Sequence, residues 1–167
     1  MPLAVELLAQ ARILATIDPG VPSQANLRRA ISAAYYAVFH LLISEAVATL
    51  VPVQPRGLGD RVSRSFNHNE MQKICLAVVK TDLADKFGIL FGSGISSNLR
   101  VVAERFSVLQ QARHAADYDV GQLFSRSLAL THIENAELAF QNWAPIRNTE
   151  EAIVFLTALA FGARWAK

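Results

Sequence analysis

The residues with the clearest chemical potential lie in one short polar segment, Arg113-His114-Ala115-Ala116-Asp117-Tyr118. An arginine supplies a fixed cation that suits a phosphate group. A histidine titrates near neutral pH, where its imidazole can accept or release a proton. These residue types therefore indicate chemistry on a phosphate, and a second segment bears on the same question.

That second segment is Leu27–His40, which contains the run Arg-Ala-Ile-Ser-Ala-Ala-Tyr-Tyr-Ala-Val-Phe-His and ends at His40. Together with the later Arg113–Tyr118 segment, it resembles the HEPN family (higher eukaryotes and prokaryotes nucleotide-binding), over roughly residues 3 to 144. The resemblance implies a small helical bundle. The family includes ribonucleases, toxins paired with nucleotidyltransferase antitoxins, and members without an assigned role.

The catalytic members of that family share an arginine, a polar residue directly after it, and a histidine four to six residues further along, usually where two protomers meet. Arg113 and His114 match the start of this motif, and Tyr118 stands where the histidine is expected. A tyrosine with a pKa near 10 is a poor general base at pH 7. The resemblance implies catalytic roles for Arg113, His114 and Tyr118, and ligand binding by Arg113, Asp117, Tyr118, Tyr36 and His40.

Two other arginine–histidine spacings match the same motif. Arg126 and His132 lie inside an expected helix, roughly 120° apart around its axis, so they cannot converge within one protomer. Arg61 and His68 span a break between two short helices, which could bring them together. His114, His68 and His132 are thus the alternatives to the missing histidine.

The same residues also have a structural interpretation. An Arg113–Asp117 pair could brace a turn at the end of a helix. Tyr35, Tyr36 and Phe39 lie in a long apolar helix and are typical core aromatics. His40 could be a satisfied core imidazole, or it could reach Asp117 or Tyr118.

The sequence predicts no cofactor and no metal. No compact His-x-x-x-His or Glu-x-x-His unit is present, and the glycines at 88–94 do not form a phosphate-binding loop. The single cysteine, Cys75, forms no internal disulfide, which favours a reducing compartment, and the N-terminus shows no secretory pattern. We therefore expect a cytoplasmic protein without a membrane anchor.

The charge balance excludes broad electrostatic binding of nucleic acid. The chain has 167 residues, 52% of them hydrophobic and 18% charged, with a net charge of +2. Residues 21–80 hold seven Lys/Arg and three Asp/Glu, an excess of 7 − 3 = +4 that allows a modest phosphate-facing surface.

These residues must be positioned by helices, since no strand pattern competes with the helical periods. We predict an all-α antiparallel bundle of five to seven helices in one domain of residues 1–167, with its core at 3–144. A break at 115–120 and a helix capped by Asp119 are expected after the fifth helix, and Pro145 ends the sixth. The expected helices are 3–17, 26–50, 60–65, 70–80, 99–114, 119–144 and 148–165, with a loop at 81–98. Ser23 is the candidate cap of the second helix, and Asn148, with Glu151 three residues later, opens the last one.

Two expected helices carry more apolar surface than a simple bundle explains. Helix 26–50 has apolar residues on two sides, and helix 148–165 is apolar nearly all round. A symmetric homodimer would cover both. We expect a HEPN-like homodimer that binds RNA or nucleotide, with a nucleotidyltransferase-type antitoxin as a potential partner; the alternatives are a metal-independent endoribonuclease and a non-enzymatic interaction protein.

Overall fold

The computed structural model describes residues 2–53, 57–80, 91–92 and 94–165, and all of the regular secondary structure in this part of the chain is helix. The all-α prediction is confirmed. Most of the 81–98 loop lies outside the described residues. The helices are α1 (Leu3–Thr16), α2 (Gln24–Leu50), α3 (Leu58–Ser63), α4 (His68–Lys80), α6 (Ser97–Tyr118), α7 (Arg126–Trp143) and α8 (Glu150–Trp165).

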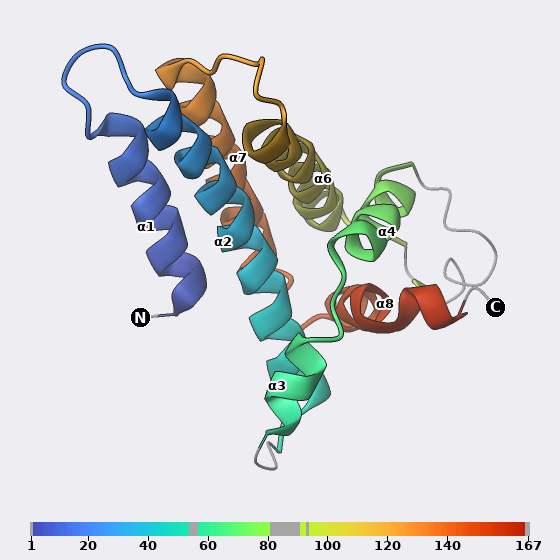
Figure 1. Ribbon diagram of the computed structural model, residues 1–167. Helices are drawn as coiled ribbons and strands as arrows, with labels where there is room; N and C mark the ends of the chain where they lie inside the picture. Colours follow the sequence, from blue (N-terminus) through green and yellow to red (C-terminus); the bar gives the residue numbers. More distant parts are fainter. Residues whose placement is uncertain (1, 54–56, 81–90, 93, 166–167) are drawn as a thin grey trace.

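Four helices, α1, α2, α6 and α7, run side by side as an antiparallel bundle, and α4 and α8 pack beside them (Figure 1). Helix α2 lies at the centre, since it contacts α1, α6, α7 and α8. Its sequence has no glycine or proline, and Ser23 caps its start by accepting from the Asn26 backbone N–H, as predicted. This central helix carries Ser32, Tyr35 and Tyr36, whose hydroxyls hydrogen-bond to residues of the candidate site.

The two-sided apolar pattern of α2 is explained within one chain. Leu27, Ile31 and Leu42 are fully buried on one side, and Ala33 and Ile43 are buried on the other. Helices of the same protomer cover these sides, so the pattern no longer argues for a dimer. By length and composition α2 could also cross a membrane, but 72% of its most apolar window is buried inside the protein, as in any core helix.

Helix α8 packs its apolar residues against α2 and α4. Phe155 and Leu156 are fully buried there, and Ile153 is exposed. The predicted cap at Asn148 is wrong, because the Thr149 hydroxyl accepts from the Ala152 backbone N–H. The carboxylate of Glu151 instead accepts from the Ser96 backbone N–H, 2.9 Å away, which ties α8 to the start of α6.

The end of α6 is the main departure from the predicted elements. The helix continues through Tyr118, one turn beyond the predicted end at His114, and α7 begins at Arg126 with Ser125, not Asp119, as its cap. The physical reason is Arg28, which donates to the backbone carbonyls of Ala116, Asp119 and Gln122. A cation at the negative end of a helix that also satisfies its free carbonyls stabilises the added turn.

Candidate functional site

Arg113 is the centre of the candidate site, and its guanidinium is held by two neighbouring side chains. Its Nε lies 2.7 Å from Asp117 Oδ2, and its Nη2 donates to Tyr36 Oη over 3.1 Å. The added turn of α6 makes the Arg113–Asp117 pair an i,i+4 pair on one helix face. The pair proposed as a structural alternative is therefore present, and it coexists with a cavity that Arg113 lines.

The α2 helix fixes the orientation of this pair. The hydroxyl of Ser32, which is buried, donates to Asp117 Oδ1. Burial alone would lower the pKa of Arg113, but Tyr36 and Asp117 outweigh it and raise that pKa. Arg113 is therefore a permanent cation in a fixed place, with a side chain that is 17% exposed.

Two tyrosine rings flank the guanidinium. The Arg113 Cζ lies 5.6 Å from the ring centroid of Tyr36 and 5.5 Å from that of Tyr118, within range of cation–π attraction. The Tyr36 ring is partly buried, whereas Tyr118 is 62% exposed. His114 is also exposed, and its ring centroid lies 5.1 Å from that of Tyr118. Tyr118 thus presents an aromatic face beside a cation.

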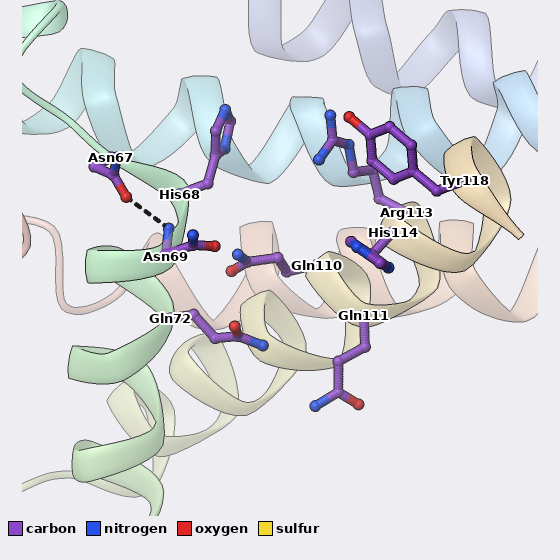
Figure 2. A pocket seen from close by; sticks show the side chains of 9 residues that line it. All are labelled: Asn67, His68, Asn69, Gln72, Gln110, Gln111, Arg113, His114 and Tyr118. Atoms are coloured by element: carbon purple, nitrogen blue, oxygen red, sulfur yellow. Dashed lines mark hydrogen bonds between the residues drawn. The ribbon is translucent and has the colours of Figure 1, made fainter.

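A polar cavity of about 650 Å³ opens between α4 and α6 at this point. Figure 2 shows the side chains of Gln110, Arg113 and Tyr118 along the α6 wall, opposite residues from the start of α4. Five of the nine lining residues are carboxamides, so the cavity is rich in uncharged hydrogen-bonding groups. The lining consists of Asn67, His68, Asn69, Gln72, Gln110, Gln111, Arg113, His114 and Tyr118.

His68 brings an imidazole to the opposite wall of the same cavity. Its Nδ1 lies 2.6 Å from Tyr35 Oη, and its ring stacks on Phe39 with centroids 4.3 Å apart. Burial lowers the pKa of His68, and the charge of Arg113 lowers it further. Burial also raises the pKa of Tyr35, so its phenol stays protonated. His68 is therefore neutral at pH 7, and no hydrogen bond within the described residues occupies its Nε2.

The spacing of Arg61 and His68 in the sequence allowed these two residues to come together, but in the structure His68 shares its cavity with a different arginine. Arg61 is exposed on α3, and no hydrogen bond or ion pair in the described residues joins it to His68. The arginine that shares a cavity with His68 is Arg113, on α6. Both lie about 6 Å from one ring: the His68 centroid is 6.1 Å from that of Tyr36, which Arg113 also contacts.

The other predicted residues lie apart from this cavity. His40 lines a separate, more apolar cavity of about 580 Å³ with Phe39 and Ile43, although its ring centroid lies 6.4 Å from that of Tyr36. Burial lowers the pKa of His40. The structure therefore joins Arg113, His114, Asp117, Tyr118 and Tyr36, whereas His40, one turn after Tyr36 on the same face of α2, lines the neighbouring cavity.

Arg126 and His132 serve the packing of α7. Arg126 donates to the backbone carbonyls of Asp18 and Gly20, which ties α7 to the α1–α2 loop. His132 is partly buried, and burial lowers its pKa. Within the described residues, no group of three or more His, Cys, Asp or Glu gathers in a way that could hold a metal ion.

No protein-family model, curated protein or solved structure matches the chain. The function of the chain is therefore inferred from the geometry of this cavity and from the resemblance of its sequence to the HEPN family.

Proposed function

We propose that this chain is a HEPN-like protein that binds RNA or a nucleotide in the cavity between α4 and α6, with Arg113 holding a phosphate. The observation that carries the proposal is the fixed guanidinium of Arg113 beside the exposed ring of Tyr118. A phosphate accepts charge-assisted hydrogen bonds from such a cation, and an unpaired base stacks on an exposed aromatic ring.

Two arginines beside a neighbouring pocket indicate the direction in which a bound strand would run. A shallower pocket of about 450 Å³ shares Tyr118 with the main cavity and is lined on its other side by Arg28 and Arg29. Arg28 is occupied by backbone carbonyls, but Arg29 is exposed on the surface of α2. A strand that stacks on Tyr118 would therefore extend toward Arg29.

The test is the binding of a fluorescently labelled single-stranded RNA, followed by anisotropy in low salt. Because a hydrogen bond to a charged group contributes about 1.5–3 kcal/mol, Arg113→Ala should weaken binding by about 10- to 100-fold. Arg12→Ala is the matched control, since Arg12 is an exposed arginine of α1 that pairs with Glu137 of α7 and lines neither of the two pockets. Equal affinities of Arg113→Ala and the wild type would overturn the proposal.

A second proposed function, metal-independent endoribonuclease activity, is favoured by the neutral imidazole of His68 in the same cavity as Arg113. In the tautomer whose Nδ1–H donates to Tyr35 Oη, Nε2 of His68 would take the 2′-hydroxyl proton while O2′ bonds to phosphorus. The P–O5′ bond then breaks and O5′ takes up a proton from water, which leaves a 2′,3′-cyclic phosphate and a 5′-hydroxyl. Arg113 would stabilise the negative charge that builds on the phosphate oxygens.

This second function is tested by incubating RNA with the protein and EDTA between pH 5 and 9. His68→Gln should abolish cleavage, whereas His114→Gln should retain it. The wild-type rate should fall as the pH drops through the pKa of His68, which burial and Arg113 hold below the ordinary value of about 6.5, because protonated His68 is no longer a base. Cleavage that persists in His68→Gln would contradict this assignment, and intact RNA in every sample would leave binding as the function.

The resemblance alone supports a homodimer and a nucleotidyltransferase-type partner from a toxin–antitoxin or defence pair. Light scattering on the purified chain tests the first. Co-purification with such a transferase tests the second.

A further inference from the structure

Gln110 is an unusual residue for the inner wall of the cavity. Its side chain is buried, with the residue only 7% exposed, and its Oε1 has no hydrogen-bond partner among the described residues. Figure 2 shows its carboxamide pointing from α6 into the space toward Asn69 and Gln72 of α4. Because buried polar atoms are nearly always paired, a buried acceptor without a partner on a residue that lines a cavity indicates a ligand that brings a donor to it.

The surroundings of Gln110 restrict what that ligand is. Gln72, partly buried on α4, and Asn69 add further carboxamides, which carry donors and acceptors but no charge. An anion is disfavoured beside the open Oε1 acceptor. A neutral, planar group with N–H donors and ring acceptors along one edge fits this end of the cavity, and nucleobases have such edges.

The spacing along α6 links this end of the cavity to the phosphate end. Gln110 and Arg113 are three residues apart, so they lie on the same helix face as neighbours. One nucleotide could therefore place its phosphate at Arg113 and its base at Gln110.

We infer that Gln110, assisted by Gln72, forms a base-recognition subsite that accepts an N–H donor of an unpaired nucleobase and gives the protein a preference among bases. This inference rests on the proposed function, since it needs a ligand whose phosphate lies at Arg113. It adds that binding is selective for the base, which a phosphate site alone would not produce.

The experiment measures the affinities of four homopolymeric RNA pentanucleotides, one for each base, for the wild-type protein and two variants. The wild type should prefer one base by about tenfold or more. Gln110→Met keeps the size of the side chain but removes the acceptor, so it should bring the four affinities to within about threefold. Gln110→Glu keeps an acceptor and should preserve the order of preference while weakening all four.

Controls separate the failure of this inference from the failure of the proposed function. Arg113→Ala should weaken all four pentanucleotides by a similar factor and keep their order. If the wild type binds all four equally, the subsite is wrong while phosphate binding stands; if it binds none, both are wrong. A base preference that survives in Gln110→Met also overturns the subsite.

Two further arms complete the design. Should Gln110→Met lose its helical circular dichroism, Gln72→Met, on the opposite wall, replaces it and should reduce the preference in the same way. The four nucleoside monophosphates, used as competitors, distinguish a free nucleotide from a strand: equal potency to the pentanucleotides indicates the former, and much weaker competition indicates the latter.

Discussion

Arg28 of α2 and Arg113 of α6 are both partly buried, and both lie near the C-terminal end of α6, but they have different hydrogen-bond partners. Arg28 donates to three backbone carbonyls, of Ala116, Asp119 and Gln122, and thereby holds the α6–α7 connection. Arg113 is held by the side chains of Asp117 and Tyr36 and lines a polar cavity. Backbone partners make an arginine part of the fold, whereas side-chain partners beside a cavity orient it toward a ligand.

The largest effect is expected on the free energy of unfolding when Arg28 is replaced. Arg28→Ala leaves three carbonyls without their donors, so we expect the free energy of unfolding to fall by about 2–4 kcal/mol. Arg29→Ala, at the exposed neighbouring residue, should change it by less than about 0.5 kcal/mol. Urea denaturation followed by circular dichroism measures both. Equal losses in the two variants would show that the carbonyl contacts do not stabilise the connection.

A smaller effect is expected at the hydrogen bond that orients His68. Tyr35→Phe removes the hydroxyl that pairs with His68 Nδ1 in a buried setting. The cost should be about 1–1.5 kcal/mol of unfolding free energy, with the fold retained. Tyr36→Phe is a useful companion, since it removes the hydroxyl that accepts from Arg113 at a partly buried site. No loss of stability in Tyr35→Phe would argue against the His68–Tyr35 pair.

The smallest effect concerns the coupling between Arg113 and His68. The pKa of His68 is lowered by burial and by the charge of Arg113, so Arg113→Ala should raise that pKa part of the way to about 6.5. An NMR titration of the imidazole resonances measures it. A His68 pKa that is the same in both proteins would mean that the two groups do not interact.

The lowered pKa also sets the sign of a pH effect on stability. The unfolded chain binds a proton at His68 more readily than the folded protein does, so unfolding becomes easier as the pH falls from about 6.5 toward the lower folded value. His68→Gln should reduce this slope in denaturation curves measured between pH 5 and 8. A slope that the substitution does not change would assign the effect to other groups.

The sequence predicted what depends on local patterns. The central helix, its Ser23 cap and the Arg113–Asp117 pair follow from spacing along one segment. The last turn of α6 was not predicted, because the backbone carbonyl of Ala116 accepts from Arg28, which lies 88 residues earlier in the chain. A backbone carbonyl is the same in every residue, so the sequence does not show which side chain will bind it.

The candidate site was predicted only in part, because some of its residues come together only through the packing of distant helices. Arg113, Asp117 and Tyr118 lie in one segment, but His68 meets Arg113 only because α4 packs against α6. Gln110 could have been found from the sequence alone, because it is a polar residue in an apolar part of its helix. It lies four residues after Phe106 and next to Leu109, so it interrupts an apolar face with a polar side chain.

The most direct test of the central claim follows the side-chain Nε–Hε resonances of Arg28 and Arg113 by NMR while a single-stranded RNA pentanucleotide is added. The account predicts that the Arg113 resonance shifts in a saturable way and that the Arg28 resonance stays in place, because carbonyls already hold it. A titration in which the Arg113 resonance does not move, or in which Arg28 alone responds, would contradict the assignment of Arg113 as the residue that binds the phosphate.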